Sequence, residues 1–375
     1  MRVLIQQALL ISTVGFISAR QLSLNAEGTF KIVQFSNMFI DNYGTNYAFT
    51  MHNVQNVVDD ENPDLVVLTG NTVAPLMEDS FTDKFTEAIQ YFKDLQIPWI
   101  STGGEDAPES IKRDQMFSIE HSIGLASDLH GDTLSLSGLN NPQSSTLGQY
   151  TARVPVMTSD RTQVAFNIWI LDSQGGYDCD GNKQGKSCIN NSTVQWFLNE
   201  SAQQNKTKFQ QSDLAFTTYP LQEYMTAVNS MPVYGHFGQD VCCQAINTGT
   251  FDAIKSSNKI AMISAGADAE NDFMVNYHGV KLAYGRKSGY GGTRDLDMGA
   301  RVIKIASNGQ ISTYIREYDG DIYEQSSQQV PAHNATTAQT ACCAKYDIQD
   351  TTSDPGLTNQ GEIKWTEMNG NTLIQ

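Results

Sequence analysis

Acidic side chains gather in two short segments of the sequence, each of which follows an apolar run. The carboxylates are those of Glu105, Asp106, Asp268, Glu270 and Asp272. Three or more carboxylates held close together would bind Ca²⁺, a cation that prefers oxygen ligands. The more ordinary interpretation, which we favour, is that these residues cap turns and face solvent. The sequence therefore predicts no cofactor, with calcium as the weaker alternative.

Sequence patterns for other kinds of catalysis are absent. The chain has no Gly-x-Ser-x-Gly elbow, no Walker-type loop and no dinucleotide-binding fingerprint. Arg286, Lys287 and the glycines around Tyr290 would suit an anion-binding loop, although turn formation explains the glycines equally well. The sequence singles out no carboxylate pair of the kind that glycoside hydrolases use.

The six cysteines are an even number, which suits a framework of disulfides. Cys179 and Cys188 flank a short polar loop and are candidates for a local disulfide. A bridge between sequence neighbours is strained, so we expect Cys242-Cys243 and Cys342-Cys343 to bond elsewhere, in one arrangement pair to pair. That arrangement would staple the C-terminal tail to the body of the protein. A zinc site is the competing interpretation, but no His or third Cys lies nearby at zinc spacing.

Asparagine sequons and the N-terminus both indicate secretion. The sequons have their acceptors at Asn190, Asn191, Asn199, Asn205 and Asn334, and the clustering of the first four predicts a glycosylated surface. Residues 1–19 resemble a signal peptide, because Arg2 precedes an uncharged run that ends in small residues. That run is short and polar for a membrane span, although an uncleaved anchor remains the alternative. We therefore expect a secreted, extracellular protein that is not inserted in a membrane after cleavage.

The net charge limits the classes of molecule that the protein could bind. A charge of −17 would be repelled by nucleic acid and by an anionic membrane surface. The partner that we expect is therefore another protein or a second copy of this chain.

Short apolar runs alternate with helical patterns along the chain, which is typical of an α/β fold. Strands are expected at residues 30–36, 64–69, 99–102, 163–172, 213–217, 259–264, 280–284, 301–306 and 311–317. Helices are expected at 47–59, 81–95, 109–123, 193–204 and 250–256. Several of these strands end in Gly or small polar residues, so the loops after them should meet at one sheet edge, where open α/β folds place their ligands.

The loops at that edge carry a family resemblance. The segments are KIVQFSNMF (31–39), PDLVVLTGN (63–71), PWISTGGED (98–106), LAFTTYPLQEY (214–224) and GADAENDF (266–273). Between and after them come DVCCQAINTG (240–249), YGRKSGYGG (284–292) and GARVIK (299–304). In order and spacing, residues 30 to 318 resemble the calcineurin-like metallophosphoesterases, and most of all the branch related to purple acid phosphatases. Active members hold two divalent metals ~3.5–4 Å apart with a bridging water as the nucleophile.

The resemblance also shows that this chain has changed the first ligand loops. Where the family has Asp-x-His, this chain has Asn37 and Phe39, and Asn71 takes the place of the bridging Asp. In the Gly-Asn-His motif, Gly104 stands at the Asn ligand and Glu105 at the catalytic His. Amides keep the shape of a carboxylate without its charge, so we expect the two asparagines to keep the hydrogen bonds of the loops.

The remaining ligand positions have changed as well. Thr218 occupies the position of a single His before Pro-Leu, and Ala267 and Ala269 replace both histidines of Gly-His-x-His. Without the bridging carboxylate, two dications would repel each other with little to offset the repulsion. Loss of the imidazoles is also expected to enlarge the cleft.

The resemblance implies an α/β fold of the metallophosphoesterase type, a four-layer α/β/β/α sandwich. We expect a signal peptide at 1–19, one domain at 27–320, and a loosely structured tail at 321–375 that a disulfide could tie down. The function that follows is that of a secreted, catalytically inactive pseudoenzyme with a binding, structural or assembly role. The alternatives are an extracellular filament or matrix subunit, and a residual hydrolase that uses the acidic segments with calcium.

Overall fold

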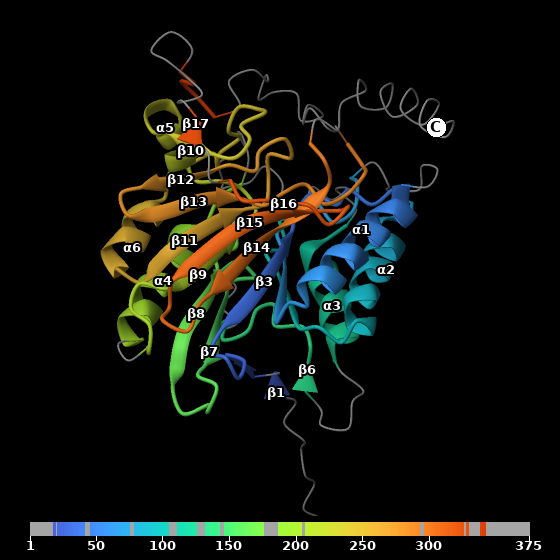
Figure 1. Cartoon of the computed structure of the whole chain (residues 1–375), viewed down its shortest axis with the longest axis horizontal. Coiled ribbons are helices and arrows are strands. Elements are labelled where there is room, and N and C mark those ends of the chain that lie inside the picture. The colour runs from blue at the N-terminus through green and yellow to red at the C-terminus, as the bar shows by residue number, and fades with distance from the viewer. Residues whose placement is uncertain are drawn as a thin grey trace, which may run out of the picture.

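The computed structural model describes residues 18–19, 21–41, 46–75, 79–104, 111–125, 132–142, 146–175, 187–204, 207–292, 296–325, 328–329 and 338–342. Two β-sheets lie in the middle of the molecule, with one group of helices on each outer side (Figure 1). A short pair of parallel strands, β1 (Ser18–Ala19) and β6 (Asp132–Thr133), lies apart from the sheets.

The first sheet has six strands in the described part of the chain. Their order is β16 (Ile322–Tyr323), β15 (Ile311–Glu317), β14 (Gly299–Ile305), β3 (Phe30–Phe35), β4 (Leu65–Leu68) and β5 (Trp99–Ser101). Strands β3, β4 and β5 run parallel, whereas β14 is antiparallel to β3. The outer face is covered by α1 (Asn46–Glu61), α2 (Phe81–Asp94) and α3 (Arg113–Gly124).

The second sheet has nine strands in the same part of the chain. Their order is β17 (Gln328–Gln329), β10 (Val233–Tyr234), β12 (Met274–Tyr277), β13 (Val280–Tyr284), β11 (Ile260–Ala265), β9 (Asp213–Thr217), β8 (Val164–Ile170), β7 (Ala152–Met157) and β2 (Leu22–Ser23). Its outer face is covered by α4 (Asn191–Gln203), α5 (Gln222–Ser230) and α6 (Thr250–Ser257).

Three apolar clusters hold these layers together. One lies between the sheets, where Ile32 and Val67 of the first sheet meet residues such as Phe166 of the second. The other two lie between each sheet and its helices. Strands such as β4 are buried on both faces, which explains why the run Leu65–Leu68 is continuously apolar. The expected four-layer α/β/β/α sandwich is confirmed.

The helix expected at 81–95 is confirmed with its inward face. Its residues Phe81, Phe85, Ala88, Ile89 and Phe92 are all buried. They recur at helical spacing, so their side chains form one apolar stripe against the first sheet. Several elements of the fold were not expected from the sequence, among them β7, β12 and α5. Strand β7 contains Pro155, which argues against a strand, and α5 begins in the motif segment 214–224 and continues beyond it.

The domain boundaries are wider than the expected 27–320. Leu22 and Leu24 are buried in the cluster between the sheets, so the fold includes residues before 27. After residue 320, β16 pairs with β15 and Gln325 is buried, so the tail begins as part of the sheet. Ser18–Ala19, where cleavage is expected, pair with Asp132–Thr133. The signal peptide itself stays a prediction, because residues 1–17 lie outside the described part.

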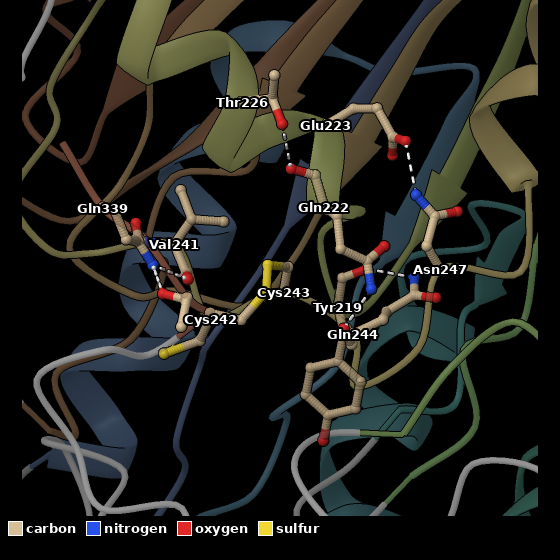
Figure 2. The surroundings of a disulfide bond; sticks show 12 residues. Tyr219, Gln222, Glu223, Thr226, Val241, Cys242, Cys243, Gln244, Asn247 and Gln339 are labelled. Atoms are coloured by element: carbon tan, nitrogen blue, oxygen red, sulfur yellow. Dashed lines mark hydrogen bonds between the residues drawn. A yellow bond between two sulfur atoms is a disulfide. The ribbon is translucent and has the colours of Figure 1, made fainter.

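A disulfide ties the tail to the body. Cys243 and Cys342 are bonded, as expected for one adjacent pair joined to the other, and Figure 2 shows their surroundings. Gln339 reinforces this attachment, since its side chain exchanges hydrogen bonds of 2.9 and 2.7 Å with the backbone of Val241. Cys188 and Cys242 are also disulfide-bonded. Cys179 and Cys343, their expected partners, lie outside the described residues.

None of the helices in the described part of the chain has the length and apolar character needed to span a bilayer.

Candidate functional site

The loops that carry the expected ligand positions meet where parallel strands of both sheets end. The backbone N–H of Asn37, after β3, donates to Gly70 O at 3.2 Å, and the N–H of Phe39 donates to Asn71 O at 2.9 Å. In the other sheet, Ala267 N donates to Thr218 O at 2.7 Å. The structure therefore brings the substituted positions of both sheets to one edge.

A chain of amide hydrogen bonds occupies the centre of this edge. Asn71 Nδ2 donates to Asn37 Oδ1 at 2.9 Å, and Asn37 Nδ2 donates to Gly266 O at 2.6 Å. Asn37 follows a strand of one sheet and Gly266 follows a strand of the other, so the chain of bonds joins the two sheets. Both asparagines are almost fully buried. A carboxylate only accepts hydrogen bonds, so neither donation is available to an ionised Asp at these positions.

The first two ligand loops also have an unusual backbone. Asn37, Phe39 and Asn71 adopt φ angles of 50°, 43° and 54°. Asparagine tolerates this left-handed region, but for a bulky side chain such as Phe39 the conformation is strained. The phenyl ring is buried, and the ammonium of Lys287 lies 5.9 Å from its centre. The loop thus holds a shape that the phenyl side chain does not itself favour.

Gly104 and Thr218 fit each other directly. A Cβ added at Gly104 would lie 2.1 Å from Thr218 Oγ1 and 2.4 Å from Thr218 Cβ. The Thr218 hydroxyl is 2.6 Å from that of Thr102, and Thr218 is fully buried. The asparagine that the family resemblance places at position 104 has no room beside this threonine. The chain's own atoms fill the space beside Gly104, and the expected enlargement of the cleft stays a prediction.

In the loop after β11, the residues at the two expected histidine positions have no side-chain ligand atoms, and the carboxylate between them is buried. Ala267 and Ala269 carry only methyl groups, and Ala269 contacts the cluster beneath α1 and α2. Asp268, between them, accepts from Cys242 N at 3.0 Å and from Tyr284 OH at 2.6 Å. Burial, together with the Asp268 carboxylate, raises the pKa of Tyr284 well above its ordinary value, so the phenol stays protonated and donates.

The residues present do not fit a dinuclear metal centre. Such a centre needs carboxylate and imidazole ligands around two cations. In the described part of the chain, no group of three or more His, Cys, Asp or Glu side chains is arranged to hold a metal ion. Glu105 and Asp106 lie outside the described residues, so the calcium alternative stays untested.

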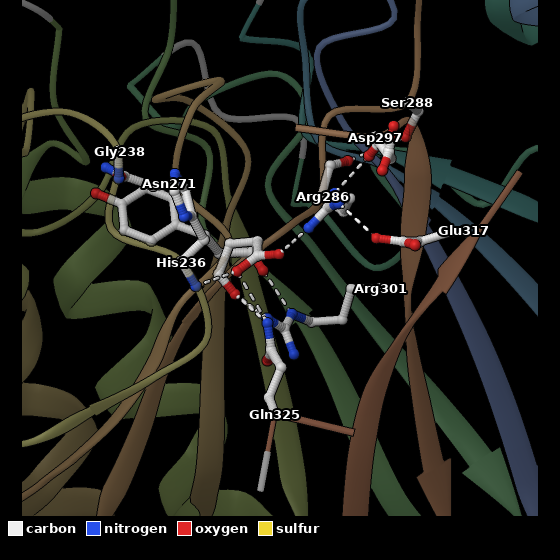
Figure 3. A network of polar contacts seen from close by, with 11 residues as sticks. His236, Gly238, Asn271, Arg286, Ser288, Asp297, Arg301, Glu317 and Gln325 are labelled. Carbon is white, nitrogen blue, oxygen red and sulfur yellow. Dashed lines mark hydrogen bonds and ion pairs between the residues drawn. The ribbon is translucent and has the colours of Figure 1, made fainter. Parts of the chain in front are cut away.

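Asp272 is neutralised by arginine. Figure 3 shows the surrounding polar network, with Arg286, Arg301 and Gln325 close together. Its buried carboxylate forms an ion pair with Arg286 and accepts from His236 N at 2.6 Å and from Gln325 Nε2 at 2.9 Å. Arg301 is fully buried and donates to Asp272 O at 2.5 Å. Burial lowers the pKa of Arg301 to about 10, so its guanidinium is still charged at neutral pH.

The cations expected to bind an anion are already engaged. Arg286 donates to Glu317 Oε1 at 2.7 Å as well as pairing with Asp272. The Lys287 ammonium donates to the carbonyl oxygens of Gly289 and Gly291, so the glycine-rich turn surrounds a cation of the chain itself. The anion-binding interpretation of this loop is therefore wrong.

A buried polar network beside the site was not expected from the sequence. Gln34 Nε2 donates to Thr69 Oγ1 at 3.0 Å and to Ala265 O at 3.2 Å, and Ser264 Oγ donates to Gln34 Oε1 at 2.6 Å. Ser36 Oγ and Thr69 Oγ1 lie 2.6 Å apart. The signal was present, because a polar residue in an otherwise apolar strand run needs a partner once it is buried.

The candidate glycosylation sites lie in different environments. Asn190 is buried at the start of α4, whereas Asn191 and Asn199 are exposed on that helix. Asn205 and Asn334 lie outside the described residues.

Comparisons with known proteins agree with the motifs. No family model matches the chain. It is 24% identical over 335 residues to probable inactive purple acid phosphatase 14 of Arabidopsis thaliana, which covers 79% of this chain and 80% of the relative. It is 23% identical over 320 residues to probable inactive purple acid phosphatase 29 of the same plant, covering 77% and 80%. These similarities agree with the resemblance of the loop segments to the calcineurin-like metallophosphoesterases.

Two solved structures are similar to this metallophosphoesterase-like chain. One is a dimetal phosphatase from Danio rerio, at 9% identity and a TM-score of 0.49, covering 83% of this chain and 99% of the other. The second is GAP50, the anchor in the inner membrane complex of Plasmodium, at 10% identity and a TM-score of 0.46, covering 86% and 92%.

Substitution of Asn37 by Asp tests the bridge between the sheets. Asn37→Asp replaces the donor to Gly266 O with a carboxyl group, and we expect a loss of about 1–3 kcal/mol in the free energy of unfolding at neutral pH. Burial against a carbonyl raises the folded-state pKa of the new carboxyl above its unfolded value of about 3.9. The variant should therefore keep its stability below that unfolded value and lose it as pH rises through the folded pKa.

Urea unfolding of both proteins between about pH 4 and about pH 7 measures this difference. Asn276→Asp, at an exposed position of β12, is the control and should cost little at any pH. An Asn37→Asp variant that unfolds like the wild type throughout this range would show that the bridge contributes nothing.

A double-mutant cycle tests the fit between Gly104 and Thr218. Gly104→Ala alone should cost about 1–3 kcal/mol, because the added methyl overlaps Thr218. Thr218→Gly removes the three atoms nearest to the added Cβ, which all belong to the Thr218 side chain. Gly104→Ala should therefore cost less in the Thr218→Gly background, with a coupling of about 0.5–3 kcal/mol. Unfolding free energies of the four proteins that add up independently would contradict this contact.

Proposed function

We propose that this chain is a secreted pseudoenzyme that keeps a metallophosphoesterase scaffold for binding or assembly. The observation that carries the proposal is the hydrogen-bonded chain Asn71–Asn37–Gly266, which joins the loops at the position of the metals. The amide groups satisfy the loop ends without a cation. The names of the plant relatives, which describe inactive phosphatases, support the same conclusion.

The substitutions act together, which argues against a site rebuilt with other ligands. Phe39, Ala267 and Ala269 offer no donor atom. Gly104 also offers none, and Thr218 leaves no room for an Asn side chain in its place. A cation at this edge would meet amide N–H groups and a phenyl ring instead of carboxylates. The matched positions supply neither the bridging carboxylate nor the imidazoles that would hold the metals, and it is the metals that activate the bound water.

Secretion is part of the proposal. The Cys243–Cys342 disulfide supports an oxidising compartment, because disulfides of this structural kind are rare in the cytosol. The N-terminal uncharged run and the sequons support the same compartment. The net charge of −17 argues against nucleic acid or an anionic membrane as the partner and favours a protein.

Metal content and phosphatase activity test the loss of catalysis. Protein secreted and purified without chelators should contain no stoichiometric Fe, Zn or Mn, and adding each metal should produce no turnover of an aryl phosphate. Calcium titration with thermal melting is the companion measurement for the acidic segments, since a bound ion raises the melting temperature. About two transition metals per chain with turnover of ~1–10³ s⁻¹ would overturn the pseudoenzyme proposal.

A second candidate function, an extracellular filament or matrix subunit, is favoured by one surface feature. Exposed apolar side chains lie at Phe49, Tyr318, Ile322 and Tyr323. Together with Tyr290, we call these residues the aromatic patch. The rings of Phe49 and Tyr290 lie 5.5 Å apart, and those of Tyr290 and Tyr318 lie 6.4 Å apart. Ile322 and Tyr323 belong to β16, the outermost strand of the first sheet in the described part, and exposed edges of this kind pair with other chains.

Solution mass tests this second candidate. Light scattering of the wild-type protein should give a mass well above the 41.3 kDa of one chain. Ile322→Lys puts a charge on the edge strand and should return the protein to single chains. Leu125→Lys, at a similarly exposed position after α3, is the matched control and should leave the mass unchanged. A wild-type protein that is monomeric at high concentration would remove self-assembly and leave a different partner protein.

A further inference from the structure

Two glycosylation sequons overlap at the start of α4. Asn190-Asn191-Ser192 makes Asn190 an acceptor, and Asn191-Ser192-Thr193 makes its neighbour one. The sequence alone gives no reason to prefer either asparagine. The fold, however, uses the two side chains in different ways.

Asn190 has a structural role that a glycan would abolish. It is the N-cap of α4, and its Oδ1 accepts from Thr193 N at 2.8 Å. Its Nδ2, the atom that would carry a sugar, donates to Thr146 O at 2.9 Å. Only 8% of the residue is exposed. A sugar on this nitrogen would have to occupy space that is already filled, so a chain glycosylated at Asn190 does not fit this fold.

Asn191 and Asn199 are exposed on the same side of α4. Both line a groove of about 610 Å³ between the helix and a wall of Asn140, Pro142, Thr146 and Leu147, and Gln195 lines it between them. The positions are separated by successive steps of four residues, which places them on neighbouring turns of one helix face. Both amides are therefore presented to solvent along the same wall of the groove.

The Thr193 hydroxyl is an independent indication that the Asn191 sequon is used. Thr193 is fully buried, and its Oγ1 has no hydrogen-bond partner among the described residues. A buried hydroxyl without a partner costs about 1–3 kcal/mol, so valine would serve the fold better at this position. A hydroxyl at this position is, however, required for the Asn191 sequon in the unfolded chain.

We propose that Asn191 and Asn199 carry N-linked glycans and that Asn190 does not. In each transfer, Asn Nδ2 forms a bond to C1 of the sugar and loses a proton. The bond from C1 to the diphosphate of a lipid-linked oligosaccharide donor breaks, and the lipid diphosphate leaves. This inference rests on the proposed secretion, and it makes the groove beside α4 a carbohydrate-covered face that is closed to protein partners.

The overlapping sequons allow matched variants of the full chain. Ser192→Ala removes the Asn190 sequon and leaves that of Asn191, whereas Thr193→Val removes the Asn191 sequon and leaves that of Asn190. Neither change removes the cap, because its donor is the backbone N–H of residue 193. Asn199→Gln removes the third acceptor at an exposed position. Each variant is expressed with its own N-terminus in a eukaryotic secretory host.

The readout is the position of heavy-oxygen label after enzymatic deglycosylation, which converts each glycosylated Asn to labelled Asp. Secreted wild-type protein should be labelled at Asn191 and Asn199 and not at Asn190. Ser192→Ala should keep the same number of glycans as the wild type. Thr193→Val and Asn199→Gln should each lose one.

Two results separate this inference from the proposed function. Label at Asn190 in folded, secreted protein, or an unlabelled Asn191 or Asn199, would overturn the site assignment and leave secretion intact. A chain that stays unglycosylated inside the cell would overturn both the assignment and the proposed secretion.

Discussion

The edge where the two sheets meet depends on hydrogen bonds that satisfy the polar groups of the loops at the strand ends. Parallel strands from both sheets end at this edge, and their loops bring polar backbone together in a buried space. Here the Asn37 amide supplies the link, by donating to Gly266 O at 2.6 Å while it accepts from Asn71. In an active metallophosphoesterase, the family resemblance implies that carboxylates at these positions would instead face cations. Neutral amides form the hydrogen bonds of these loops, but they lack the negative charge that binds metal ions.

Other residues near this edge are also satisfied by partners within the chain. Thr218 fills the space beside Gly104, so the two substitutions depend on each other. Asp272 is paired with Arg286, and Lys287 is surrounded by carbonyl oxygens of its own loop. Each of these charged groups is satisfied within the chain. In the pseudoenzyme that we propose, these pairings would stabilise the fold where an active phosphatase keeps charged ligands ready for a cation, in agreement with the trade-off between function and stability.

The surface shows where such a scaffold can still make contacts. The Cys243–Cys342 bond fixes the tail close to Asp268, because the neighbouring Cys242 N–H donates to that carboxylate. The aromatic patch lies over α1 and the β15–β16 edge, whereas the candidate glycan acceptors lie on α4 over the other sheet. The two proposals thus place contacts with proteins and attachment of sugars on different layers of the sandwich. A partner that binds the patch would not meet the α4 face.

The sequence by itself, through its resemblance to the metallophosphoesterases, predicted the four layers and the substituted ligand positions. Periodicity located most strands and helices, and residue types alone identified Phe39, Ala267 and Ala269 as side chains without donor atoms. Strand β7, with its proline, escaped because its place depends on pairing with β8. Only the tertiary structure decided that Thr218 leaves no room for a side chain at Gly104 and that Arg286 forms an ion pair with Asp272. It also decided that Asn190 is buried while Asn191 is exposed. These facts depend on residues distant in sequence, such as Thr146 and Asn190, and local pattern carries no information about which distant atoms will meet.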